Sequence, residues 1–531
     1  MSGGTLIEVA GDIVLRFTQS VTERYNPDEP EFTLESFGYD PLPRTGREWN
    51  YHSFDEPIYQ EYSDREVSNS LNVRVIDAAS PDNEDQHENE AETMAWKRLR
   101  PSALQTGFKS MYIGALISLL TALNIGTIYL LLSYANYKTT SNCEQIDIVI
   151  SARVEWQTTI ADVISCFFYY TCPLLNLFLL FRPYQLKGVK RKLILVSFII
   201  YCLDPLYRGV LQALRKPFFE LSALYSSLSN VPVYMFVFTN VCLLFYFAAK
   251  HVIVLPRLKL VFQICKMAMP TCLTILSAFA IRYLVYPAYN EKHTDGKLLI
   301  ALFSPLMGVI FKAVSRICVQ RLWNITHPGY SYVLLAPLYF LLAIMFRVLQ
   351  ADLDSLESIA ILGVIHGFAE VVERSTVVII DHICHQICRR ESSPWGSFRT
   401  PRRERLMADI AIMSMLYEST AIVSVNGLLH LYQWIYLENE SFLKLFLSFA
   451  KYTSVPLVIE WFFTSVSLAI ETRYQNMAVM AVWRRQWKRH ILVAIVNILP
   501  VAIWTSGNLL VVIRHRFDNV PGNQACKVPF S

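Results

Sequence analysis

The run His366-Gly367-Phe368-Ala369-Glu370-Val371-Val372-Glu373-Arg374 places four ionisable side chains inside a stretch that is otherwise apolar enough to enter a lipid bilayer. The flanking apolar residues lie at 359–365 and at 377–380. At about 100° per residue, four ionisable side chains of this segment fall within roughly 80° on one helical face: His366, Glu370, Glu373 and Asp381. Arg374 follows Glu370 by four residues, which is the favourable order for an ion pair within one helix.

This charged face indicates what must surround the helix. A charged side chain at the centre of a membrane helix costs roughly 2.5–3.5 kcal/mol on insertion scales. Several on one face are tolerated only where that face meets protein or water, so we expect other helices to pack against it. The composition agrees with a membrane protein, because only 17% of the residues are charged, well below the roughly 25% of a soluble domain.

The chain divides into an acidic tail and a basic, apolar body. Residues 1–100 contain 21 Asp and Glu against 9 Lys and Arg, and the remainder contains 23 against 39. The tail has little apolar surface to bury, so we predict a mostly disordered cytoplasmic segment over 1–105 that could recruit cytosolic partners. For 106–514 we predict an all-α polytopic transmembrane helix bundle, followed by a short extracytoplasmic tail at 515–531.

Apolar spans of about 20 or more residues, each long enough to cross the hydrocarbon layer, recur along the body. Eleven are predicted: 110–135, 159–181, 192–214, 231–255, 259–286, 298–320, 331–350, 356–384, 406–436, 442–471 and 490–513. The last has basic residues at its far end, so ten is the alternative count. Every second connection is basic, which predicts a cytoplasmic N-terminus and an extracytoplasmic C-terminus. Whether the membrane is the plasma membrane or an endomembrane stays open.

Two features on the predicted outer side would be consistent with this orientation. Asn439-Glu440-Ser441 is a glycosylation acceptor sequence, and it falls between the ninth and tenth spans. Cys143 and Cys526 are the two cysteines predicted outside the membrane on that side, where a disulfide could form.

Acidic residues on other spans suggest a shared polar interior. Span 10 has the stripe Glu460, Thr464, Ser467 and Glu471, and span 9 contains Glu418. Spans 2 and 3 contain Asp162 and the Asp204–Arg208 pair. We predict an intramembrane cavity lined by spans 2, 3, 8, 9 and 10, with a structural ion-pair network between helices as the alternative. Four basic residues toward span ends are interpreted as interface anchors: Arg282, Lys312, Arg316 and Arg347.

Transport of a small solute or ion is the function that this pattern favours. A receptor or signalling scaffold is the first alternative, and a membrane-embedded enzyme acting on lipid is the second. The two-histidine zinc-protease pattern, the nucleophile elbow, the phosphate loop and the dinucleotide fingerprint do not occur. We therefore expect no metal, no cofactor and no nucleic-acid partner. The sequence points to no known family.

Overall fold

The computed structural model describes sixteen stretches and single positions of the chain: 103–116, 119–120, 123–124, 152–181, 183–186, 188–213, 223–252, 256–291, 294–320, 322, 326, 328–353, 355–389, 401–436, 441–471 and 479–517. The described part is almost entirely helical and contains no strand. The predicted all-α class is confirmed. The acidic tail before residue 103, Cys143, Asn439 and Cys526 lie outside the described residues, so the predictions about them stay predictions.

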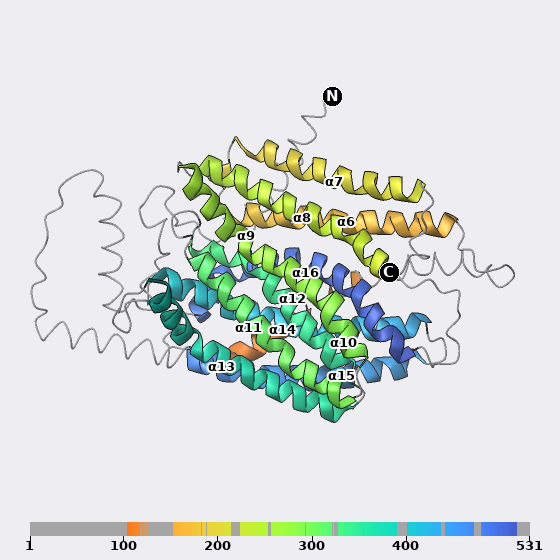
Figure 1. Cartoon of the computed structure of the whole chain (residues 1–531). Helices are drawn as coiled ribbons and strands as arrows, with labels where there is room; N and C mark the ends of the chain where they lie inside the picture. Colours follow the sequence, from red (N-terminus) through yellow and green to blue (C-terminus); the bar gives the residue numbers. More distant parts are fainter. Residues whose placement is uncertain are drawn as a thin grey trace, which may run out of the picture.

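Helices make up most of the described chain (Figure 1). They are α6 (Ala152–Leu180), α7 (Lys190–Ala213), α8 (Ala223–Val252), α9 (Arg257–Ala280), α10 (Tyr286–Asn290), α11 (Thr294–Gln320), α12 (Ala336–Ala351), α13 (Leu356–Arg389), α14 (Pro401–Tyr436), α15 (Phe442–Ala469) and α16 (Val479–Phe517). Short segments join some of them: η2 (Pro183–Leu186), the π turn η3 (Ile281–Val285) and η4 (Pro328–Leu334). α9 and α10 continue through η3, and α16 departs from helical geometry at Gln486.

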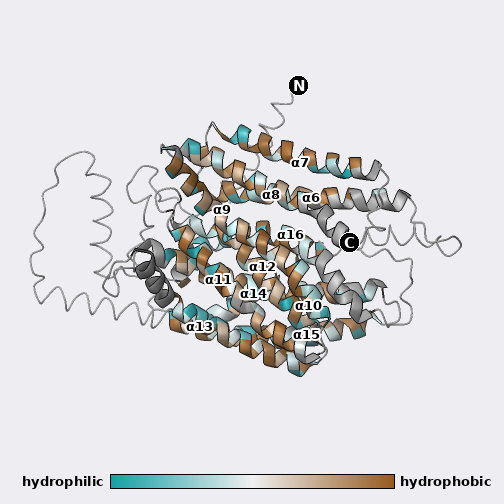
Figure 2. Cartoon of the chain, viewed as in Figure 1, coloured by the Kyte–Doolittle hydropathy of each residue, from teal (hydrophilic) through white to brown (hydrophobic). Residues whose placement is uncertain are grey.

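Seven helical segments of the described chain are long and apolar enough to cross a membrane: Lys190–Val210, Pro232–His251, Leu258–Asn290, Gly296–Gln320, Arg405–His430, Phe442–Ala469 and Gln486–Thr505. Their outer faces expose large apolar side chains, such as Phe198, Phe262 and Phe303. Hydrophobic residues accordingly run along α7, α9 and α11 in Figure 2. In water this surface would be unfavourable, but against lipid tails it is the expected exterior.

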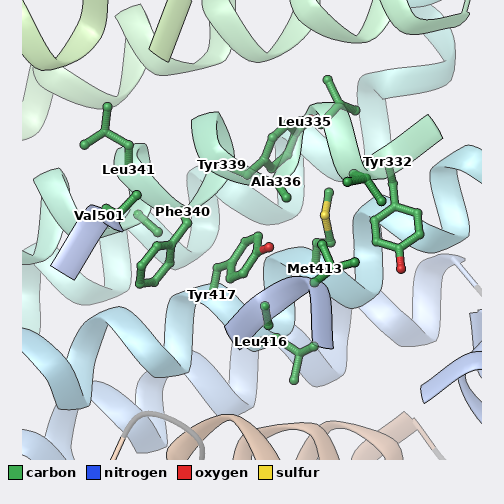
Figure 3. Close-up of a cluster of buried hydrophobic side chains, with 14 of the residues drawn as sticks. Tyr332, Leu335, Ala336, Tyr339, Phe340, Leu341, Met413, Leu416, Tyr417 and Val501 are labelled. Carbon is green, nitrogen blue, oxygen red and sulfur yellow. The ribbon is translucent and has the colours of Figure 1, made fainter. Parts of the chain in front are cut away.

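α12 is the buried centre of the bundle. Every side chain from Leu338 to Gln350 is buried, and the helix contacts α9, α11, α14 and α16. Its 16 residues rise only about 24 Å at 1.5 Å each, less than the ~30 Å of hydrocarbon. Figure 3 shows part of the surrounding core, in which Phe340 of α12 lies against Tyr417 of α14 with ring centroids 5.1 Å apart.

α6, α7 and α8 form a layer along one side of this core (Figure 1). These three helices contact one another, and the layer joins the rest through α6 with α16 and through α8 with α9. On the opposite side α13 packs against α15 and α11. The charged segment at 366–374 of α13 therefore lies at the periphery of the bundle, with one face toward protein.

Small residues allow α13 to approach α15 closely. A Cβ atom added at Gly367 would lie 2.3–3.0 Å from ring atoms of Phe463, whereas one added at Gly209 of α7 meets no heavy atom within 4 Å. Gly363, four residues earlier on α13, faces Ile459 of α15. Small residues at such spacing are how membrane helices bring their backbones together.

Gly367→Ala is therefore expected to destabilise the bundle by about 1–3 kcal/mol, the usual range for overpacking. The measurement is the apparent unfolding temperature of purified protein in detergent. Gly209→Ala is the matched control, because it adds the same methyl group on a helix where there is space. Equal unfolding temperatures for the two variants would contradict the close approach of α13 and α15.

Candidate functional site

The polar and apolar residues of α13 separate onto two faces. Phe368 is 62% exposed and Ile361, Val364 and Val372 share its outward face. Glu370 is 6% exposed, on the inward face. The expectation that the charged face contacts other helices is confirmed for the residues whose side chains are described. The side chain of Asp381 is not among them.

Arg347 of α12 is the first centre of charge inside the bundle. Its guanidinium donates to Glu460 of α15 at 2.7 Å, to Glu418 of α14 at 3.1 Å and to Gln350 at 2.9 Å. Gln350 in turn donates to the carbonyl of Ile359 at the start of α13, at 2.8 Å. One arginine thus joins three helices, and Gln350 extends the network to a fourth.

Arg374 of α13 is the second centre. It forms a two-pronged contact with Glu471, at 2.7 and 2.8 Å, just beyond the end of α15. It also lies 3.5 Å from Glu370, so the predicted pair four residues apart on one helix is present. Ser414 of α14 donates to the same Glu370 oxygen at 2.8 Å. Paired arginine and carboxylate groups with these geometries are the strong class of charged hydrogen bond.

Lys312 of α11 is the third basic group, and it pairs with Glu373 at 3.2 Å. The interpretation of Lys312, Arg316 and Arg347 as interface anchors is wrong. Arg316 and Arg347 are buried, and the Lys312 side chain is only 14% exposed. Their positions toward the span ends suggest snorkelling, but acidic residues on neighbouring helices lie 3.2 Å from Lys312 and 2.7 Å from Arg347.

His366 lies between these centres without a hydrogen bond of its own. Its ring stacks on Phe346 with centroids 3.7 Å apart and planes 15° apart. Both ring nitrogens are buried and have no hydrogen-bond partner. The nearest acidic atom is Glu418 Oε1, 3.9 Å from Nε2. A buried polar group in this state is unusual enough to require an explanation.

The charges of this interior do not balance among the described residues. The cluster holds five carboxylates against four basic side chains: Glu370, Glu373, Glu418, Glu460 and Glu471 against Lys312, Arg316, Arg347 and Arg374. With His366 neutral, one negative charge is left over. A buried uncompensated charge is costly, so a proton or another cation is expected to complete the set.

A small cavity opens beside this cluster. Its volume is about 30 Å³, and its polar lining includes Ser414, three carboxylates and three basic groups: Glu370, Glu373 and Glu471 with Lys312, Arg316 and Arg374. Since about 10–15 Å³ is enough for one water molecule, the cavity has room for one or two waters or a small ion. An organic solute would require the helices to separate.

The contributing helices differ in part from those predicted. The cluster comprises α11, α12, α13, α14 and α15, which correspond to spans 6 to 10. Asp204 and Arg208 of span 3 pair with each other at 3.1 Å, and Arg208 also reaches Cys166 of α6. This pair belongs to the α6–α8 layer. The side chain of Asp162 is not among those described.

A second buried charged group joins α14 to α16. Asp409 lies 2.9 Å from His490 Nε2 and 3.5 Å from Arg405. The other ring nitrogen of His490 lies 3.0 Å from the carbonyl of Gln486, and Tyr332 of η4 stacks on the ring. The carbonyl and the carboxylate on the two sides of the His490 ring are both hydrogen-bond acceptors.

Sequence reasoning missed Asp409, His490, Ser414 and Gln350 as members of buried networks. Asp409 and His490 stand alone on their helices, so no stripe marks them. Arg347 is a different case, because an arginine within an otherwise apolar helix is itself a signal. It predicts an acidic partner elsewhere in the bundle.

No family model, no curated protein and no solved structure matches the chain.

Proposed function

We propose that this membrane protein transports a small cation, and that the transported charge passes through the polar interior formed by α11 to α15. One observation supports it above the others: the interior formed by α11 to α15 holds five carboxylates against four basic groups, and six of these nine groups line a cavity of about 30 Å³. Intramembrane ionisable residues that line a cavity are the usual markers of ion pathways and proton relays.

The position of the cluster supports transport over a purely structural role. Glu370, Glu418 and Glu460 lie near the middle of α13, α14 and α15. A structural network gains most from full charge balance, because an unpaired buried charge offsets the stability of the pairs around it. An exchangeable cation relieves this imbalance. We further propose that the N-terminus is cytoplasmic, as loop charge indicates, and that the acidic tail binds cytosolic partners.

The experiment is flux into liposomes that contain the purified protein and a trapped pH-sensitive dye. A potassium diffusion potential, negative inside, drives protons inward. We expect uptake faster than in protein-free liposomes. Glu370→Gln should reduce uptake to the protein-free level, since glutamine keeps the size of the side chain but cannot bear a charge.

Glu357→Gln is the matched control, because Glu357 is an exposed carboxylate on the same helix. It should leave uptake unchanged. Equal incorporation and equal unfolding temperatures of the variants separate loss of transport from loss of fold. If wild-type uptake of protons, and of Mn²⁺ in a parallel assay, is no faster than in empty liposomes, the proposal is overturned and a receptor or scaffold role is favoured instead. Unchanged uptake in Glu370→Gln would remove Glu370 from the path.

A further inference from the structure

Three residues from two helices bring metal-ligating atoms together inside the cluster. His366 and Glu370 come from α13 and Glu418 comes from α14, and one ligand atom of each lies within 4.8 Å of the others. The sequence places His366 and Glu370 on one face of α13 but does not indicate which residue could act with them as a third metal ligand. The packing of α14 supplies it.

The two carboxylates are each held by one oxygen, which leaves the second for another partner. Glu370 uses Oε1 for Ser414 and Arg374. Glu418 uses Oε2 for Arg347, while its Oε1 faces His366. Ligating carboxylates in metal sites are held by outer hydrogen bonds in the same way, so that their remaining oxygen is oriented toward the ion.

His366 provides a second, independent observation. Its ring stacks on Phe346, and both nitrogens are buried without a hydrogen bond, although Nε2 lies 3.9 Å from Glu418 Oε1. A neutral imidazole nitrogen without a hydrogen bond is a ready metal ligand, and coordination would satisfy one of the two.

The separations fit an ion after a small adjustment. Two ligands at about 2.1 Å from an ion lie at most about 4.2 Å apart. The 3.9 Å between His366 Nε2 and Glu418 Oε1 is already within that limit. The ligand atoms of all three residues lie within 4.8 Å of one another, so the farthest pair must approach by about 0.6 Å to share an ion.

We infer that His366, Glu370 and Glu418 bind a divalent first-row transition-metal ion, such as Mn²⁺. One imidazole nitrogen and two carboxylate oxygens suit this class, whereas Na⁺, K⁺ and Ca²⁺ favour sites made of oxygen alone. The inference deepens the proposed function, since the bound ion would be the transported cation. The site has only three protein ligands, and its histidine has no outer hydrogen bond. We therefore expect moderate affinity for the ion, which permits its release.

The test is equilibrium binding of Mn²⁺ to the full-length protein in detergent, measured by loss of the free-ion paramagnetic resonance signal. Mn²⁺ is the suitable probe because the chain has 11 cysteines, and thiolates select softer ions. We expect one ion per chain. Loss of an outer-shell partner alone weakens metal sites by about 10–100-fold, so His366→Gln should weaken binding by at least about 100-fold. Glu357→Gln should leave it unchanged.

A second variant tests the site by the appearance of a signal, which a poorly folded protein would not produce. His366→Cys replaces the imidazole by a thiolate, and Co²⁺ should then show a thiolate-to-cobalt absorption band above the wild-type baseline. Absence of Mn²⁺ binding to wild type, or binding unaffected by His366→Gln, would overturn the site. Mn²⁺ binding without uptake of either protons or Mn²⁺ into liposomes would overturn transport and leave the site standing, whereas proton uptake without Mn²⁺ binding would overturn the site and leave proton transport standing.

Discussion

Arg347→Met is expected to destabilise the protein by about 3–5 kcal/mol, the cost of removing one member of a buried ion pair. Arg347 is 4% exposed and is the basic partner of both Glu418 and Glu460. Methionine has a similar length and fills most of the volume, so the loss reflects charge more than packing. The measurement is the apparent unfolding temperature in detergent. Lys259→Met, at an exposed position of α9, is the control.

The same site offers a rescue that tests the cause. Without Arg347, Glu418 still lies 3.9 Å from His366, whereas Glu460 keeps only the hydroxyl of Thr464 at 3.1 Å. Adding Glu460→Gln to Arg347→Met should therefore restore more stability than adding Glu418→Gln. If neither second substitution raises the unfolding temperature, the loss does not come from stranded carboxylates.

Asp409→Ala is the second substitution with a large expected effect, again about 3–5 kcal/mol. Asp409 and His490 are both fully buried, and Asp409 is the acidic partner of His490 and Arg405. Its removal leaves His490 and the buried Arg405 without this acidic partner. We expect a lower unfolding temperature and loss of protein during purification.

Asp409→Asn should cost less than Asp409→Ala, because the amide oxygen can still accept from His490. Glu357→Ala is the control for loss of an exposed carboxylate on a bundle helix. The consequence of losing Asp409 should also reach η4, because Tyr332 stacks on His490 and Arg489 lies 3.2 Å from the centroid of the Tyr330 ring. Full stability of Asp409→Ala would show that this cluster is not needed to join α14 to α16.

Much of the bundle can be predicted from single segments. Helical periodicity predicted which face of α13 points inward, since 100° per residue fixes the relative directions of side chains on one helix. The stripe of Glu460, Thr464, Ser467 and Glu471 on α15 is likewise buried. The intrahelical pairs Glu370–Arg374 and Asp204–Arg208 also form.

Pairings between helices could not be predicted in this way. Arg347 and Glu460 are separated by 113 residues and Lys312 and Glu373 by 61, and nothing in the local pattern links them. The same limit explains why basic residues near span ends were interpreted as anchors. Whether a lysine reaches the interface or a carboxylate depends on which helix lies beside it.

The sequence alone determined the all-α membrane class, the separation of polar from apolar faces and the presence of ionisable groups within the bilayer, because these depend on composition and on the period of one helix. Only the tertiary structure decided which helices share the charged interior, that one carboxylate exceeds the basic groups, and that His366, Glu370 and Glu418 meet. Those properties depend on the packing of helices far apart in the chain, which helical periodicity does not encode.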